Sequence, residues 1–132
     1  MIAGVGLASA ALDFFVGNTG SPSIGYVYSG YTASGNTGAT PATDLPPLAA
    51  NDIVQCAIDI DAKRLWLRKA GDVWRPGGDP SLGTGGFDIS GLATPIVPMA
   101  SLYALGDLFI NAGQAPFASP EPAGFVPWTA AP

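Results

Sequence analysis

The chain has 132 residues, the size of one domain, and carries five Lys and Arg against ten Asp and Glu, for a formal net charge of −5. This balance argues against the positive surface that proteins need to bind a phosphate backbone. The chain has no His and a single Cys, which excludes an intrachain disulfide and His-based catalytic triads and leaves few transition-metal ligands. Hydrophobic residues make up 48%, so we expect a folded chain despite its 18 glycines and 13 prolines.

The N-terminal stretch Met1–Gly17 is largely apolar, and Ala8-Ser9-Ala10 is similar to a signal-peptidase site. A signal peptide begins with a basic region, however, and no Lys or Arg precedes Lys63. The stretch is also too short and too often interrupted for a membrane helix. We interpret it as a buried strand followed by a turn.

Short apolar runs broken by Gly, Pro, Asn or Asp are typical of an all-β sandwich or barrel, here a single domain over residues 1–132. Strands are predicted at Ile2–Ala8, Ile24–Tyr28, Ile53–Ile60, Arg64–Lys69, Pro98–Tyr103 and Asp107–Ile110, with another around Phe125–Trp128. The segments Thr32–Leu48 and Pro76–Gly86 are rich in turn-forming residues, which predicts two surface loops.

Two of these strands are expected to form an antiparallel hairpin around the polar connection Asp61-Ala62-Lys63. One face of the first strand is apolar and consists of Val54, Cys56, Ile58 and Ile60. A sheet with one apolar face packs on a second sheet. Cys56 is therefore interpreted as a small core residue and not as a reactive thiol.

The hairpin and the C-terminal part of the chain resemble the SPRY family. The resemblance lies in Asp52-Ile53-Val54-Gln55-Cys56-Ala57-Ile58-Asp59-Ile60-Asp61, Leu65-Trp66-Leu67-Arg68-Lys69-Ala70-Gly71, Phe109-Ile110-Asn111-Ala112-Gly113, Pro116-Phe117 and Pro122-Ala123-Gly124-Phe125-Val126-Pro127-Trp128. The loop Gly78–Gly86 is similar to one in SPRY-like modules of bacteriophage and prophage structural proteins. Gln55 and Ala70 depart from the family pattern, in which a small residue and an Asn stand at these positions.

The resemblance implies a two-sheet antiparallel sandwich of the concanavalin or SPRY-like jelly-roll type that lacks the family's first strand or strands. A missing strand would leave a sheet edge with unpaired backbone groups, which folded proteins normally cover. The resemblance also implies a virion protein, such as a tail fibre, spike or capsid-attached component, assembled in the bacterial host cytoplasm. Other virion proteins or further copies of the chain are then the expected partners, bound through loops and the open edge.

Concanavalin-like folds also include glycan hydrolases, which use a pair of carboxylates. The only glutamate is Glu121, in a Pro-rich segment, and Asp59 and Asp61 lie where a strand enters a turn, a position at which aspartates commonly bind backbone amides. No loop carries the density of carboxylates that calcium requires. The sequence therefore favours a protein that is not an enzyme and holds no cofactor or metal.

Candidate binding residues are drawn from aromatic and basic side chains near predicted loops. The basic residues fall within thirteen positions: Lys63, Arg64, Arg68, Lys69 and Arg75. They form either a positive patch for an acidic partner or the solvated surface of a hairpin. Trp and Arg often anchor interfaces, which singles out Trp74, Arg75, Arg68 and Trp66, and Tyr31 is the exposed aromatic candidate. An alternative function is a lectin-like module that binds host surface glycans through Tyr31, Trp74 and Arg75.

Overall fold

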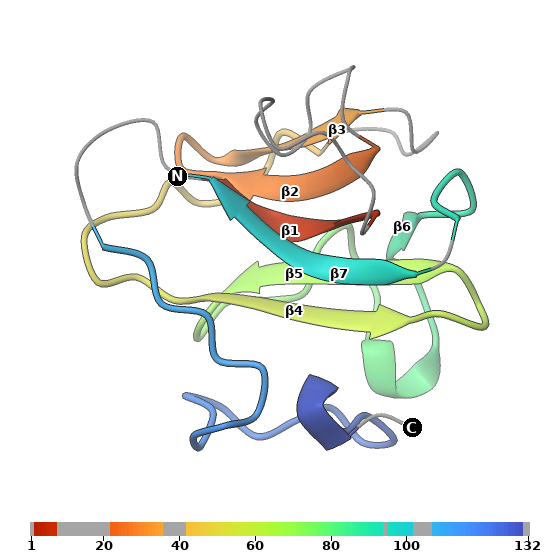
Figure 1. Ribbon diagram of the computed structural model, residues 1–132. Helices are drawn as coiled ribbons and strands as arrows, with labels where there is room; N and C mark the ends of the chain where they lie inside the picture. Colours follow the sequence, from red (N-terminus) through yellow and green to blue (C-terminus); the bar gives the residue numbers. More distant parts are fainter. Residues whose placement is uncertain (1, 8–21, 36–41, 94, 102–106, 131–132) are drawn as a thin grey trace.

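The computed structural model describes residues 2–7, 22–35, 42–93, 95–101 and 107–130 (Figure 1). The strands are β1 (Ile2–Leu7), β2 (Ser23–Val27), β3 (Tyr31–Gly35), β4 (Val54–Asp59), β5 (Arg64–Lys69), β6 (Phe87–Asp88) and β7 (Ile96–Ser101). The two helices of this part of the chain are short 3₁₀ turns, η1 (Pro80–Leu82) and η2 (Trp128–Ala130). Neither has the length or the apolar character to cross a membrane.

The strands form two antiparallel sheets, as expected of an all-β sandwich. One sheet has four strands in the order β3-β2-β1-β7, and the other has three in the order β4-β5-β6. Figure 1 shows the first sheet above the second, with the C-terminal segment passing below β4. The hairpin β4–β5 has the predicted pairing, from Val54 with Lys69 to Asp59 with Arg64.

The hydrophobic core lies between the two sheets. Its buried members come from both of them and from the segments that follow β3 and β6: Ile24, Tyr26, Leu45, Leu65, Leu67, Phe87, Ile89, Leu92 and Ile96. Burial of these side chains is the main favourable contribution to folding. The hydroxyl of Tyr26 donates a hydrogen bond to the carbonyl of Pro46, which ties the long connection after β3 to the core.

The first strand lies inside its sheet. β1 pairs with β2 on one side and with β7 on the other. The open edge that the resemblance predicts is therefore not β1. Among the described residues, the outer strands of this sheet are β3 and β7.

Several predicted elements differ from the observed ones. All of β3 except Tyr31 falls in the predicted loop Thr32–Leu48; Thr32 is buried, and the strand pairs with β2 along its whole length. The predicted strands Asp107–Ile110 and Phe125–Trp128 are wrong: the first is irregular chain, and the second ends in the 3₁₀ turn η2. The strand ends predicted at Ala8 and Tyr103 lie outside the described residues.

The loop between β5 and β6 is held in place by Trp66. Its side chain is fully buried, and its indole Nε1 donates a hydrogen bond to the Thr84 carbonyl over 2.9 Å. The ring of Phe125 meets the indole edge-on, with 6.1 Å between ring centres. Trp66 therefore connects the outer face of the three-stranded sheet to both the Gly-rich loop and the C-terminal segment.

Two aspartates fix turns in this region through hydrogen bonds. Asp79 accepts from the hydroxyl and the N–H of Ser81 at the start of η1, and Asp88 accepts from the N–H of Ser90. These bonds stabilise the ionised carboxylates and hold the pKa of both aspartates below the ordinary value.

Candidate functional site

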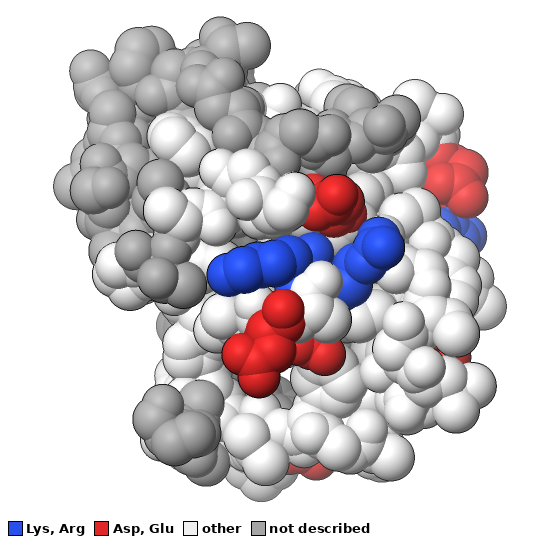
Figure 2. Space-filling view, turned by 90° about the vertical axis from the view of Figure 1, so that its right-hand side faces the viewer, with Lys and Arg blue, Asp and Glu red and all other residues white. Residues whose placement is uncertain are grey.

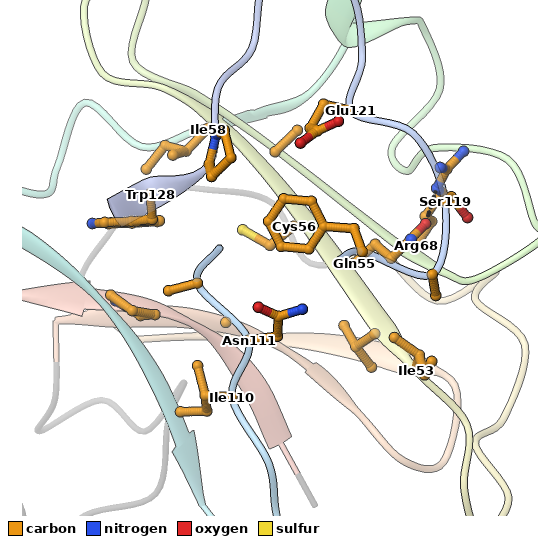
Figure 3. A pocket seen from close by; sticks show the side chains of 18 of the residues that line it. Ile53, Gln55, Cys56, Ile58, Arg68, Ile110, Asn111, Ser119, Glu121 and Trp128 are labelled. Atoms are coloured by element: carbon orange, nitrogen blue, oxygen red, sulfur yellow. Dashed lines mark hydrogen bonds between the residues drawn. The ribbon is translucent and has the colours of Figure 1, made fainter. Parts of the chain in front are cut away.

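A cleft of about 1490 Å³ lies beside strand β4. Its walls are β4, parts of β1 and β7, and the C-terminal segment from residue 107 onward (Figure 3). Several apolar side chains of these walls are exposed, and Phe109 is 90% exposed. A single domain of this size rarely leaves so much apolar surface open without a use for it.

The cleft runs along the free edge of β4. Every residue of β4, from both faces of the strand, contributes to its lining, and among the described strands β4 pairs with β5 alone. Figure 3 shows β4 crossing the view with Cys56 at its middle, Ile110 and Asn111 on one side, and Ser119 and Glu121 on the other.

The hydrogen-bond pattern of β5 shows which backbone groups of β4 point outward. The N–H and the carbonyl of Leu67 are both bonded to Arg75, on the side of β5 that faces away from β4. Leu67 is the register partner of Cys56, so these two residues form a non-hydrogen-bonded pair, in which the backbone groups point away from each other. The N–H and carbonyl of Cys56 therefore point into the cleft.

The same alternation extends along the strand. The N–H of Ala70 donates to the carbonyl of Ile53, so the backbone groups of Ile53 point toward β5. Because this direction alternates from residue to residue, those of Cys56, three positions on, point away from β5, in agreement with the result from Leu67. Val54 and Ile58 thus share the outward phase of Cys56. No hydrogen bond joins these three donors and three acceptors to another described residue. β4 presents a template for one more strand.

The other strand edges are less open to an added strand. β7 contains Pro98, which lacks an N–H. Beside β3, the N–H of Thr32 donates to the carbonyl of Ala42, and its hydroxyl accepts from the Ala42 N–H. The outer side of β5 is occupied by β6 and by the bridge to Arg75. Among the described strands, β4 has the longest edge without such cover.

The C-terminal wall of the cleft is shaped by side-chain hydrogen bonds and not by a strand. The amide of Asn111 donates to the carbonyls of Ala115 and Pro116, and its oxygen accepts from the N–H of Gly113. Gln114 bridges the Ile110 carbonyl and the Ala112 N–H. Turns of this kind keep the segment folded back on itself beside β4.

Cys56 lies at the middle of the cleft wall. It is exposed to the cleft, which corrects the expectation of a core residue, whereas Val54 and Ile58 on the same face are partly buried against the core. Desolvation by the surrounding walls raises the pKa of its thiol to about 12. The thiol is therefore protonated at neutral pH and is a weak nucleophile.

Arg68 and Trp74 come together at one end of the cleft. The guanidinium lies 4.0 Å from the ring centre of Trp74, in a cation–π contact. Its Nε donates to Gln55 Oε1 over 2.7 Å. The two side chains also line a second hollow of about 460 Å³, together with Asp72, Val73, Gly78, Asp79, Ser81, Pro120 and Pro122.

The other candidate binding residues lie elsewhere. The side chain of Arg75 is paired with Asp44 and Asp72. Tyr31 is exposed at the start of β3 and lines neither hollow. The side chain of Trp66 is fully buried and has no surface for a ligand. The structure therefore brings only Trp74 and Arg68 of this set together at the surface.

The five basic residues do not form an uninterrupted positive patch. Lys69 is paired with Asp52 at 2.7 Å, and Arg64 lies near enough to Asp88 to help lower the pKa of that carboxyl. On the face shown in Figure 2, basic side chains lie between acidic ones. The charges of the hairpin are thus largely balanced by neighbouring carboxylates.

Asp59 has a structural role at the end of β4. Its carboxylate accepts a hydrogen bond from the N–H of Ala62 in the hairpin turn. In the described part of the chain, no three Cys, Asp or Glu side chains gather as ligands of a metal ion would. The site combines an apolar cleft, a strand edge that no described strand pairs with, and an aromatic–cationic pair.

Comparison with known proteins adds no relative: no family model matches the sequence, and no curated protein or solved structure is significantly similar to it. The resemblance to SPRY domains rests on the sequence motifs alone, and the two antiparallel sheets agree with the coarser prediction of an all-β sandwich.

Proposed function

We propose that the protein is a non-catalytic interaction module that binds a partner by adding a strand of that partner to β4. The observation that carries this proposal is the outward direction of the backbone groups of Val54, Cys56 and Ile58 along the cleft. Proteins recognise extended peptides at such edges through main-chain hydrogen bonds, and pockets for alternate side chains supply specificity.

The cleft supplies binding free energy that the backbone hydrogen bonds of an added strand do not provide by themselves. Six added backbone hydrogen bonds contribute about 3–9 kcal/mol, and ordering five residues of a partner costs about 5–10 kcal/mol. These contributions roughly cancel, so net affinity has to come from side chains buried in the cleft beside Cys56. A strand edge on a flat surface would lack this contribution.

We further propose that the module is part of a phage or prophage virion, where it joins structural proteins. This part rests on the similarity of the loop Gly78–Gly86 to SPRY-like modules of such proteins and on the low content of charged residues, 11%. Head or tail genes beside the gene for this chain would support the assignment. A gene neighbourhood of metabolic enzymes would contradict it.

A peptide library displayed on phage tests strand addition even while the partner is unidentified. Selection on the full chain should enrich extended sequences that lose binding to the Cys56→Pro variant, because proline removes the N–H that points into the cleft. The Cys56→Val variant keeps this N–H and should keep binding. Enriched peptides that bind the Pro and Val variants equally well would contradict the proposal, provided that both variants melt cooperatively.

A second candidate function is glycan binding at the hollow beside Trp74. The observation that favours it is the stack of Arg68 on Trp74, which places an aromatic ring, and guanidinium Nη groups that bond to no described residue, in a hollow that Ser81 also lines. Aromatic faces of this kind stack on sugar rings. On a glycan array, the Trp74→Ala variant should lose binding while Tyr31→Ala keeps it. Equal signals from both variants would contradict the assignment.

A further inference from the structure

The charges around the cleft indicate the chemistry of its occupant. One guanidinium lines the cleft, that of Arg68, against five carboxylates: Asp52, Asp59, Asp61, Asp107 and Glu121. Asp52 is neutralised by Lys69. The other four carboxylates form no ion pair with a described residue. An extended segment that enters the cleft therefore meets a negative potential.

The register of β4 divides the side chains of an added strand between two environments. Residues directly opposite one another in neighbouring strands lie on the same face of a sheet. Partner residues opposite Val54, Cys56 and Ile58 thus point toward the apolar face between the sheets, where Leu65 and Leu67 are buried. Partner residues between them lie on the face of Gln55, Ala57 and Asp59.

We infer that the occupant of the cleft is an extended segment of a partner protein in which apolar residues alternate with Lys or Arg. This inference rests on the proposed function of β4 as the edge that accepts a strand. A second copy of the chain fits the cleft poorly, because it carries a net charge of −5 and its basic residues are confined to positions 63–75. Like charges facing each other across an interface oppose association.

Three blocked seven-residue peptides test the inference. Each carries Val at alternate positions, and the positions between hold Lys, Ser or Glu. Calorimetric titration should show at least tenfold tighter binding of the Lys peptide than of the Ser peptide, with no detectable binding of the Glu peptide. Raising the salt concentration from 50 to 200 mM should weaken the Lys peptide several-fold.

Amide hydrogen exchange in the same samples shows where the peptide binds. The Lys peptide should protect the amides of Val54, Cys56 and Ile58. Methylating the backbone nitrogens of its Val residues should abolish binding, because in an antiparallel addition these N–H groups face β4. Methylating the backbone nitrogens of its Lys residues, which face away from β4, should leave the affinity within about twofold.

Charge-reversal variants provide a second, independent readout. The Asp61→Lys and Glu121→Lys variants should each weaken the Lys peptide and strengthen the Glu peptide. The Asp44→Lys variant makes the same charge change on a residue that does not line the cleft, and should leave both affinities unchanged. This control separates local charge from net charge.

The possible outcomes distinguish the inference from the proposed function. Equal affinities of the three peptides with protection of the β4 amides would overturn the charge inference and leave strand addition standing. Lys-peptide binding without this protection, or no binding by any peptide, would overturn both. Protection of the same amides in a dimer of the chain alone would identify a second copy as the occupant and refute the inference.

Discussion

Replacing Gly86 by alanine should destabilise the protein more than the same replacement at Gly71. Both glycines have a positive φ, +81° and +84°. A Cβ at position 86 would lie 2.7 Å from Cε2 and 2.9 Å from Nε1 of Trp66, whereas position 71 has no atom within 4 Å. Trp66 is fully buried and hydrogen-bonded to Thr84, so it has little room to move away.

The magnitudes follow from these two effects. A side chain in the left-handed conformation costs about 1–2 kcal/mol at either position, and the overlap with Trp66 adds about 1–3 kcal/mol at position 86. Gly71→Ala should thus lower the free energy of unfolding by about 1–2 kcal/mol, and Gly86→Ala by about 2–5 kcal/mol. Each kcal/mol corresponds to about 3–5 °C in Tm for a chain of this size.

Urea unfolding, followed by circular dichroism, measures both variants. The Gly86→Ala, Trp66→Phe double variant should lose less free energy of unfolding than the sum of the losses in the two single variants, because the smaller ring relieves the overlap. Equal losses in Gly86→Ala and Gly71→Ala would refute the reasoning, since they would show that Gly86 does not pack against the Trp66 indole.

Three further predictions concern titration and the end of the cleft. Asp79 and Asp88 have pKa values below the ordinary 3.8. The stability that their ionised carboxylates add is therefore fully present above pH 3.8 and is lost as the pH falls through the lower pKa values of the folded protein. Between pH 6 and pH 2, the urea midpoint should change less in the Asp79→Asn, Asp88→Asn double variant than in the unchanged protein. At pH 8, Cys56, whose pKa is raised by desolvation, should react with iodoacetamide more slowly than an ordinary thiol, and a rate near the ordinary one would contradict the raised pKa. A double-mutant cycle on Arg68 and Trp74 should give a coupling of about 0.5–1 kcal/mol, and a coupling near zero would mean that the stack is absent in solution.

Much of the strand content could be predicted from local sequence pattern. β4 and β5 combine apolar runs with a tight polar turn, so both strands and their pairing followed from the sequence. β3 consists of Tyr-Thr-Ala-Ser-Gly, which has the composition of a loop, and it becomes a strand because β2 pairs with it. A strand that forms because its neighbour pairs with it, and not because of its own composition, cannot be predicted from local pattern.

In the C-terminal segment, the sequence pattern predicts a strand that does not form. Asp107–Ile110 is apolar enough to indicate a strand, yet no described strand pairs with it, and Phe109 remains exposed. The hydrogen bonds of Asn111 and Gln114 fold the chain into turns instead. Asn-Ala-Gly at positions 111–113 was the signal available in the sequence for such a turn.

The cleft itself could not be predicted, because its walls come from elements far apart in the chain. The sequence placed Cys56 on an apolar face but could not show that this face extends past the core into an open groove. It also offered Arg75 as the neighbour of Trp74, whereas the structure stacks Arg68 on that ring. Spatial neighbours in a sheet differ from sequence neighbours because adjacent residues point to opposite faces.

Amide hydrogen exchange along β4 in the isolated protein tests most directly whether this strand edge is open to a partner. The amides of Gln55, Ala57 and Asp59 bond to β5 and should exchange slowly, whereas those of Val54, Cys56 and Ile58 open into the cleft and should exchange at rates near those of an unstructured peptide. Slow exchange at all six positions would show that the edge is already covered, and a partner would then have no strand to join.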